Sequence, residues 1–309
     1  MKQILALLFA IGSLATYAQK VAWIPFSWEG VTIAGRYIDK AAIRIPASVD
    51  GISHNFVMQL DLGAITSMLY GNTVESLPDL SADLVPKTDT VSGFYIKGVK
   101  HPIYKGVCLK LGSVSMEKMA IGCHKGYGGA VHKDSINSTA LRYIGTIAPD
   151  LFADKVLIID YPNRRIAVAS SLPKSFSKAE FQPLKIKDGR IKISFSINGK
   201  QEYLLFDTGA SMFSMVTTRV NADAITDSTV VDAFDVPSWG ESIPFVGRKA
   251  NVPLKLGSKQ LNSVVVYYDK PNSFEGLYKQ EQVWGITGNA LFLDHVVIID
   301  YAKKQFGVL

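Results

Sequence analysis

The chain contains two copies of one sequence pattern. Residues 145–161 (GTIAPDLFADKVLIIDY) and residues 285–301 (GITGNALFLDHVVIIDY) are identical at nine of seventeen positions, at an offset of 140. Two shorter matches fall in the same order in both halves, at offsets of 145 and 146: VCLKLGS 107–113 with VPLKLGS 252–258, and LDLGA 60–64 with FDTGA 206–210. Solenoid repeats are usually about 20–50 residues long. A spacing near 145 residues therefore predicts two duplicated lobes.

The length and the N-terminus indicate where these lobes begin and end. A chain of 309 residues suits two domains of ~150 residues each. Residues 1–18 carry one positive charge, an apolar stretch over 4–15 and small residues near position 18, which is typical of a secretory signal peptide. We expect an N-terminal lobe over 19–170 and a C-terminal lobe over 171–309. A segment rich in serine and proline within 170–183 reads as the connection between them.

The same N-terminal segment predicts the location of the protein. Its apolar stretch of twelve residues is shorter than the ~20 residues that a transmembrane helix needs. We therefore expect an exported protein, periplasmic or extracellular, that is not inserted in the membrane after the signal peptide is cleaved.

Composition excludes several classes of protein. An apolar fraction of 48% and a charged fraction of 19% describe a chain that can form a packed core, unlike a disordered or collagen-like one. The formal charge of +6 is scattered, with no run of Lys and Arg longer than two, so we expect no nucleic-acid partner. Two cysteines cannot form a disulfide-rich scaffold or a four-thiolate metal site.

The two cysteines are expected to be unpaired. Export permits a disulfide between Cys108 and Cys123. However, a hairpin over residues 107–120 would place Cys108 opposite Met119 instead. Cys123, His124 and His132 fit no metal-ligand spacing, so no metal and no organic cofactor are implied.

Each half reads as strands joined by tight turns, which predicts an all-β protein with little helix. Residues 191–197 alternate apolar and polar side chains, Asn198-Gly199 supplies a hairpin turn, and 201–206 continue as the partner strand. The first half follows the same plan, with strands at 42–49 and 56–60. The short apolar runs 156–160 and 296–300 have strand length, and their closing residues Asp160 and Asp300 read as turn or surface residues. Single helical turns are expected at 149–152 and 289–292.

The two matching turns LDLGA and FDTGA place one carboxylate after an apolar strand in each half. Asp61 and Asp207 are each followed by a glycine two residues later, Gly63 and Gly209. Glycine lets its backbone N–H approach a carboxylate closely. One such turn is an ordinary acidic turn after a strand. Two of them, one in each duplicated lobe, would face each other across a two-fold axis.

A facing pair of carboxylates has a defined chemistry. Two carboxyl groups ~3 Å apart share one proton, because both cannot ionise together. The ionised member can accept a proton from water, and the protonated member can polarise an amide carbonyl. This pair of roles hydrolyses a peptide bond without a covalent intermediate.

Residues 207–211 (DTGAS) match the active-site loop of the pepsin and retropepsin superfamily of aspartic peptidases. The apolar-apolar-Gly turns that end at Gly145 and Gly285 resemble the second loop that crosses the active-site strand in each lobe of that family. The resemblance implies the acid-protease type of β-barrel lobe, with Asp61 and Asp207 as catalytic residues. The loop residues that it implies as their support are Gly63, Ala64, Thr208, Gly209, Ala210, Gly145 and Gly285.

The resemblance covers most of residues 40–170 and 185–309 and is closer in the second lobe. Ala64 and Ala210 resemble the retroviral-type branch, because pepsin has Ser at these positions. Together these features are similar to a bacterial-type, single-chain version of the retropepsin arrangement. They imply an aspartic-type endopeptidase that acts as a monomer on a peptide or protein, with the substrate lying in the cleft as an extended strand.

Leu62 departs from the family pattern, which usually has Thr after each catalytic Asp. In the family the two hydroxyls hydrogen-bond across the junction between the lobes. Thr208 can form its half of this interaction, whereas Leu62 cannot. Two alternatives to an active peptidase therefore remain: a pepsin-like module that binds peptides or proteins without cleaving them, and a dyad that forms only when two chains associate.

A hairpin that covers the cleft is also expected, because such a lid excludes water from the reaction. Residues 90–98 have the glycines and aromatics for it, with Tyr95 as the candidate tip. Residues 235–247, which include Trp239, are the matching stretch of the second lobe.

Overall fold

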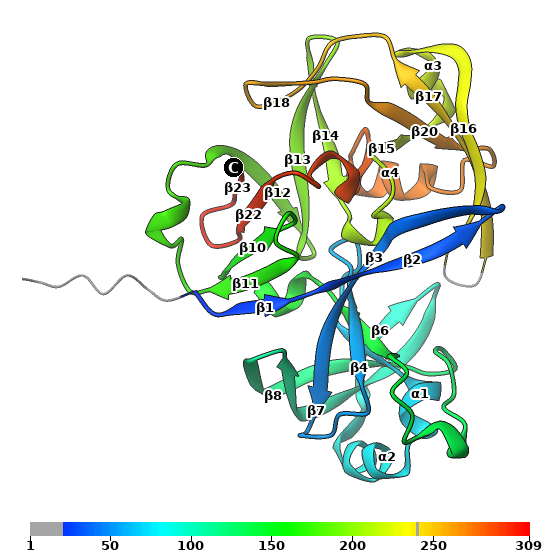
Figure 1. Ribbon diagram of the computed structural model, residues 1–309, viewed down its shortest axis with the longest axis vertical. Helices are drawn as coiled ribbons and strands as arrows, with labels where there is room; N and C mark the ends of the chain where they lie inside the picture. The colour runs from blue at the N-terminus through cyan, green and yellow to red at the C-terminus, as the bar shows by residue number, and fades with distance from the viewer. Residues whose placement is uncertain (1–20, 239–240) are drawn as a thin grey trace, which may run out of the picture.

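The computed structural model describes residues 21–238 and 241–309. The predicted signal peptide and Trp239 lie outside the described residues. Strands account for 53% of the structure and helices for 15%, so the prediction of an all-β protein with little helix is confirmed. No helix among the described residues is long and apolar enough to cross a membrane. Figure 1 shows one lobe above the other along the long axis of the molecule.

The N-terminal lobe is built on one eight-stranded sheet. Its strands lie in the order β2 (Ser27–Ile33), β3 (Arg36–Val49), β4 (Phe56–Leu60), β9 (Arg142–Ile147), β5 (Met68–Tyr70), β8 (Val114–His124), β7 (Val99–Leu111) and β6 (Thr88–Ile96). The pairs β4–β9 and β5–β8 are parallel, and β5–β9 is antiparallel.

The C-terminal lobe repeats this path. Its strands lie in the order β13 (Arg190–Ile197), β14 (Lys200–Phe206), β21 (Gly285–Thr287), β15 (Met215–Thr217), β20 (Val265–Asp269), β17 (Glu241–Ala250) and β16 (Thr226–Ser238). In addition, β18 (Leu254–Leu256) pairs with β13, and β19 (Lys259–Leu261) pairs with β18. The pairs β14–β21 and β15–β20 are parallel, and β15–β21 is antiparallel. The second half of the chain therefore folds like the first, as the duplicated sequence predicts.

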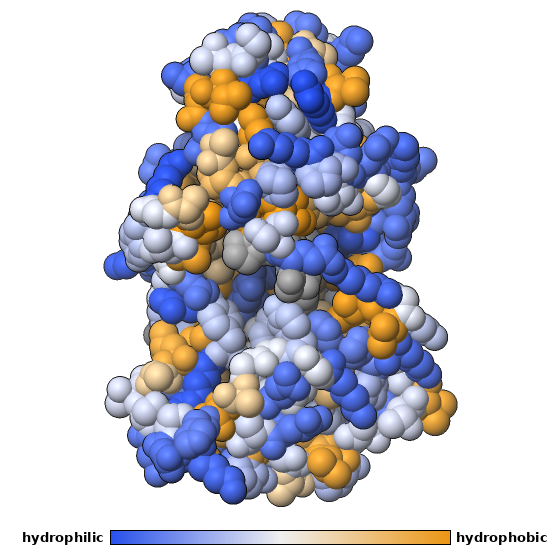
Figure 2. Space-filling model, turned by 90° about the vertical axis from the view of Figure 1, so that its right-hand side faces the viewer, coloured by the Kyte–Doolittle hydropathy of each residue, from blue (hydrophilic) through white to orange (hydrophobic). Residues whose placement is uncertain are grey.

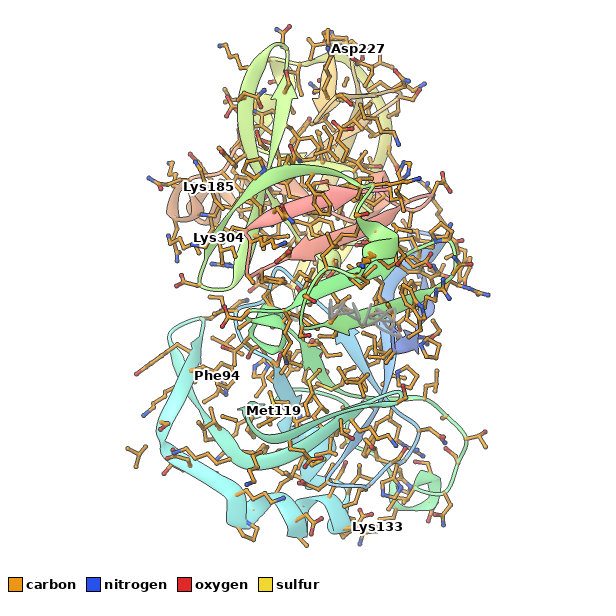
Figure 3. The ribbon with its side chains drawn as sticks, turned by 90° about the vertical axis from the view of Figure 1, so that its left-hand side faces the viewer. Phe94, Met119, Lys133, Lys185, Asp227 and Lys304 are labelled. Carbon is orange, nitrogen blue, oxygen red and sulfur yellow. The ribbon has the colours of Figure 1, made fainter. Side chains whose placement is uncertain are left out.

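A third group of strands joins the two lobes. They are β1 (Trp23–Pro25), β11 (Arg165–Ala169), β10 (Val156–Asp160), β22 (Val296–Asp300), β23 (Gln305–Val308) and β12 (Glu180–Lys187), in that order. The two copies of the repeated apolar run, β10 and β22, pair antiparallel with Ile158 opposite Ile298. Because the copies lie side by side in opposite directions, they place a pseudo-two-fold axis between the lobes. Lys304, in the turn after β22, marks these strands in Figure 3.

The hairpin turns follow from the local sequence. Asn198 and Gly199 have φ of +49° and +77°, and Asp50 and Gly51 have φ of +50° and +83°. Two consecutive residues with positive φ are the geometry that Asn-Gly and Asp-Gly favour in two-residue hairpins. Both predicted hairpins, β13–β14 and β3–β4, are confirmed.

The structure differs from the sequence prediction at the end of the connection between the lobes. Of residues 170–183, the last four already belong to strand β12, which pairs with β23. Pro183 is tolerated there because it is exposed and a proline fits a strand where its missing N–H is not needed.

Helices are short. The single turns η3 (Pro149–Phe152) and η6 (Asn289–Leu291) confirm the two predicted at these places. Four short helices were not foreseen: α1 (Gly71–Glu75), α2 (Pro78–Leu84), α3 (Arg219–Asp223) and α4 (Glu275–Glu281). At five to seven residues they are too short to show a helical period in the sequence.

Asp160 and Asp300 close the two central strands, as predicted, but they are buried rather than on the surface. Asp160 accepts hydrogen bonds from the Asn163 amide (3.2 Å) and from Arg165 Nε (2.8 Å). Asp300 accepts one from the amide of Lys303 (2.9 Å). Both carboxylates therefore hold the turn that follows their strand.

The cysteines are unpaired, as expected. The predicted neighbour of Cys108 was wrong, because register shifts in β7–β8 place Val107 opposite Met119. The thiol of Cys108 instead lies 3.4 Å from Glu117 Oε1, and that of Cys123 is buried against the Tyr104 hydroxyl.

The β2–β3 hairpin of the N-terminal lobe packs against the C-terminal lobe. Ile33 belongs to a buried apolar cluster together with Phe213 and Phe234. At the rim, Arg36 donates to both carboxylate oxygens of Asp232 on β16, at 2.8 and 2.9 Å. Figure 1 shows this blue hairpin reaching across to the yellow strand. The lobes are therefore held together on the side away from the central strands as well.

Candidate active site

Asp61 and Asp207 occupy equivalent turns. Each follows the last residue of a buried strand, β4 or β14, and its amide donates to a carbonyl of the neighbouring parallel strand segment, at 2.9 Å in both lobes. Asp61 Oδ1 accepts hydrogen bonds from the amides of Gly63 and Ala64, both at 3.0 Å. These bonds fix the carboxylate over its own turn.

The second lobe repeats this arrangement. Asp207 Oδ1 accepts hydrogen bonds from the amides of Gly209 (2.8 Å) and Ala210 (3.2 Å). Two amide donors on one oxygen leave the other oxygen of each carboxylate free to face the opposite lobe.

The structure brings the two carboxyl groups together. They hydrogen-bond to each other, and each lies against the glycine of the opposite turn. A Cβ atom added to Gly63 would lie 2.3 Å from Asp207 Cγ, and one added to Gly209 would lie 2.8 Å from Asp61 Cγ. Any side chain at these two positions would therefore push the carboxyl groups apart.

Both carboxyl groups of the pair have a raised pKa. Burial, the negative charge of Asp207 and the hydrogen bond to it raise the pKa of Asp61 well above its ordinary value. Burial also raises the pKa of Asp207, but the Gly209 amide and the Asp61 carboxyl oppose that rise. The pKa of each carboxyl group is therefore raised, as expected for two acids that share one buried site.

The raised pKa of Asp61 predicts how stability depends on pH. Its ordinary pKa is 3.8. Between that pH and the higher pKa of the folded state, the folded protein holds a proton on Asp61 that the unfolded chain has released. This contribution to the free energy of unfolding is complete below about pH 4 and is lost as the pH rises through the folded-state pKa. We expect Asp61→Asn, which cannot ionise, to gain Tm relative to the wild type as the pH is raised above about 4. Thermal unfolding across a pH series measures this difference, and two curves that stay parallel would contradict it.

Thr208 links the two turns, and Leu62 does not. The Thr208 hydroxyl accepts a hydrogen bond from the Leu62 amide (2.9 Å) and donates one to the Leu60 carbonyl (2.8 Å). The side chain of Leu62 is fully buried in the main apolar core and has no hydroxyl to return to the amide of Thr208. One hydroxyl, from Thr208, therefore links the two turns, although a two-fold symmetric junction could have one from each lobe.

The two predicted second-loop glycines lie where strands cross closely. A Cβ atom on Gly145 would lie 2.1 Å from the Met68 carbonyl oxygen, and one on Gly285 would lie 2.2 Å from that of Val216. These contacts are between backbones, so a side chain could not be accommodated by a rotamer change. Both glycines let β9 and β21 pack against β5 and β15, beneath the two acidic turns.

Sequence reasoning missed a buried network beneath the Asp207 turn. Asn289 donates to the Thr208 carbonyl (3.1 Å) and to the Ser211 hydroxyl (2.9 Å). Its carbonyl oxygen accepts a bond from Tyr161, which follows β10 (2.7 Å). Tyr161 is part of the repeated motif, but its partner lies 128 residues away, so no local signal could have identified the pair.

The two carboxyl groups open into a cleft of about 330 Å³ between the lobes. The N-terminal lobe contributes Gln59, Tyr70 and Tyr127 to its walls. The C-terminal lobe contributes mainly apolar side chains: Phe213, Val216, Val236, Phe245, Phe274, Leu277 and Ile286. The cleft is therefore polar and aromatic on one side and apolar on the other. In Figure 2 the outline of the molecule narrows at mid-height, and we call this region between the lobes the waist.

Tyr70 and Tyr127 are the aromatic residues of the N-terminal lobe at the cleft, and the sequence did not single them out. Their rings meet edge to face at 4.9 Å between centroids. Tyr70 is buried and hydrogen-bonded to the Thr146 hydroxyl at 2.6 Å. Burial raises the pKa of both phenols, so they face the dyad as neutral groups.

The hairpin proposed as a cover exists, but its tip lies further along the chain than the sequence indicates. Tyr95 is on strand β6, is 69% exposed and does not line the cleft. Lys97 and Gly98 form the turn, with φ of +46° and +79°. Lys97 was overlooked because lysine is not a usual residue for positive φ. Its ammonium lies 2.6 Å from Glu241 Oε1 on β17 of the other lobe.

No group of three or more His, Cys, Asp or Glu side chains within the described ranges is placed to hold a metal ion.

No protein-family model matches the sequence, and no curated protein does. Among solved structures, the chain is similar to basic 7S globulin from soybean, with a TM-score of 0.47 and 12% identity over 93% of this chain and 94% of the other. It is also similar to an aspartic proteinase from Irpex lacteus, with a TM-score of 0.47 and 13% identity over 94% and 97%.

Proposed function

We propose that the chain is an aspartic-type endopeptidase that hydrolyses peptide bonds with Asp61 and Asp207. The observation that carries this proposal is the close approach of two carboxyl groups that line one cleft, each packed against the glycine of the opposite turn. Each comes from an equivalent turn of a duplicated lobe. The DTGAS motif at 207–211 supports the same assignment.

The proposed mechanism needs one ionised and one protonated carboxyl group, and we propose Asp207 as the ionised member. Asp207, the ionised member, would accept a proton from a water molecule. At the same time the oxygen of that water attacks the carbonyl carbon of the peptide. Asp61, the protonated member, would give its proton to the carbonyl oxygen. The tetrahedral diol then collapses: the C–N bond breaks, the amine nitrogen takes the proton from Asp207, and Asp61 recovers one from the diol hydroxyl. Both carboxyl groups end as they began.

The shape and lining of the cleft support an extended peptide as substrate. We expect one flank of the cleaved bond to carry a bulky apolar side chain, because the C-terminal lobe offers an apolar wall that includes Leu277. A peptide library incubated from about pH 3 to 7, with and without a statine-type inhibitor, tests both points. Cleavage that a statine does not inhibit, or that has no apolar preference, would contradict the proposal.

A single substitution checks the apolar wall. Leu277→Glu on α4 places a charge where an apolar substrate side chain would lie. We expect kcat/KM for apolar peptides to fall about tenfold, with little change in Tm because Leu277 is partly exposed. Val220→Glu is the control, since Val220 is exposed on α3 and does not line the cleft.

Leu62 favours a second candidate, a module that binds peptides without cleaving them. The hydroxyl that the family pattern places here is missing, so the junction beneath the dyad has one clamp instead of two. Peptides that bind the wild-type protein without being cut, and cleavage that appears on Leu62→Thr, would identify this function.

We also propose that the protein is exported, by the signal peptide of residues 1–18, and acts as a monomer with lobes at 19–170 and 171–309. A monomer suffices because one chain supplies both carboxyl groups. The molecular mass of the protein in solution tests this. An obligate dimer would favour the alternative in which two chains together complete the site.

A further inference from the structure

Strand register shows what lies beside each carboxyl group of the dyad. In the N-terminal lobe, β3 and β4 pair with Arg44 opposite Gln59. The same register, continued by two residues, places Ala42 opposite Asp61. Residues directly opposed on antiparallel strands lie on one face of the sheet, with Cβ atoms about 4.5–5.5 Å apart. Asp61 itself follows the end of β4, so this extended register sets an uncharged residue, Ala42, at the position opposite it.

The C-terminal lobe differs at the equivalent position. There β13 and β14 pair with Lys192 opposite Leu205, and the same continuation places Arg190 opposite Asp207. The two lobes otherwise hold their carboxylates with matching pairs of amide donors. The cross-strand residue is therefore where the symmetry of the dyad is broken by a charge.

Arg190 belongs to a buried cluster that carries excess positive charge. Arg190 donates to Glu281 Oε1, and Lys192 Nζ lies 3.1 Å from Glu281 Oε2. All three side chains are at most 7% exposed. Two cations and one anion leave a formal charge of +1. Arg190 Nε has no hydrogen-bond partner within residues 21–238 and 241–309, and Glu281 is shared between Arg190 and Lys192.

The other groups around Arg190 do not cancel this charge. Lys187, its partner on β12, is exposed, and its ammonium donates to the Gln280 carbonyl. Tyr278 on α4 is buried near Asp207, and burial raises the pKa of its phenol, so it stays neutral. Two buried carboxylates lie near this part of α4: Asp269 and Asp207 both act on the Tyr278 phenol, and the Arg190 charge acts on Asp207.

We propose that Arg190 is a positioning residue for the dyad, which holds the negative charge on Asp207 and so keeps the shared proton on Asp61. A buried cation stabilises a nearby anion more strongly than it would in water, because the surroundings screen it less. Burial raises the pKa of Asp207, and the Arg190 charge is one of the influences that oppose the rise. The consequence for peptide cleavage rests on the proposed function, whereas the location of the proton does not.

Substitutions that change the charge of the cluster test this in opposite directions. Arg190→Met lowers the formal charge from +1 to 0, which destabilises every state with Asp207 ionised. Both limbs of the pH profile of kcat/KM should then move to higher pH, by about 0.5–1 unit. Glu281→Gln raises the charge to +2 and should move both limbs to lower pH. Arg190→Lys keeps the charge and should restore the wild-type profile, and Lys187→Met, which removes an exposed cation, should leave it in place.

A direct titration separates this inference from the proposed function. The carboxyl carbons of Asp61 and Asp207, followed by ¹³C NMR and assigned with the two Asn variants, report the proton without any need for activity. If the wild type never cuts peptides but the titrations shift as described, the peptidase proposal fails and the role of Arg190 stands.

A purely structural role for Arg190 gives a different pattern. It would lower Tm in both charge variants and leave their titrations unchanged, or shift them in the same direction, and either result would overturn the inference. If Arg190→Met does not fold, Glu281→Gln still decides. Its dyad titration should move to lower pH, and a titration that does not move contradicts the proposal.

Discussion

Replacing Asp207 with Asn is expected to reduce kcat/KM for peptide cleavage by ~10³-fold or more. The variant keeps the size of the side chain but removes the base that accepts the proton from water. Asp61→Asn should cause a loss of similar order, because the amide can donate a hydrogen bond to the peptide carbonyl but cannot transfer a proton to it. Initial rates on a peptide from the library, measured at the optimal pH of the wild type, give both values.

The matched control is Asp227→Asn. This residue is exposed and lies at the end of the C-terminal lobe far from the waist (Figure 3). The Asp227→Asn variant should cut peptides at the wild-type rate. Activity that survives Asp207→Asn would show that any cleavage arises elsewhere, and the proposed function would have to be abandoned.

Replacing Thr208 with Val is expected to have the largest effect on stability. Valine has nearly the same shape, but it removes the hydroxyl that satisfies the Leu62 amide and the Leu60 carbonyl. Thr208 is fully buried, so both backbone groups would lose their partner away from water. A buried unsatisfied group costs about 1–3 kcal/mol, so with two such groups the free energy of unfolding should fall by roughly 2–6 kcal/mol. Denaturant unfolding measures it.

Thr208→Ser is the control for this clamp, because serine keeps the hydroxyl and loses only a methyl group. It should retain most of the stability that Thr208→Val loses. If the two variants were equally unstable, the methyl group rather than the hydroxyl would hold the turn. Because Leu62 has no hydroxyl, no second side chain at the junction can replace the hydrogen bonds that Thr208→Val removes.

Much of the fold is local information and could be predicted. Asn198-Gly199 and Asp50-Gly51 specify tight turns by themselves, and the apolar runs at 156–160 and 296–300 have strand length and strand composition. The duplicated motif indicates that two halves fold alike. Short helices such as α4 and the turn at Lys97 escaped because neither leaves a periodic or compositional signal.

The candidate site divides in the same way. The two Asp-containing turns could be found in the sequence because each is a short contiguous motif that occurs twice. Asn289, Tyr161 and Arg190 could not, because their partners are brought to them by strand pairing over long separations.

The amino-acid sequence alone determined that the chain is all-β, that its halves are duplicates, and which turn of each half carries an acidic residue. Only the tertiary structure decided that the two turns meet and that their cleft has one apolar wall. The reason is physical: turn and strand preferences act between near neighbours, whereas a charge or an apolar side chain acts on whatever the sheet register places beside it. Arg190, for example, is 17 residues from Asp207 in the sequence, and its charge acts on that carboxyl group only in the folded lobe.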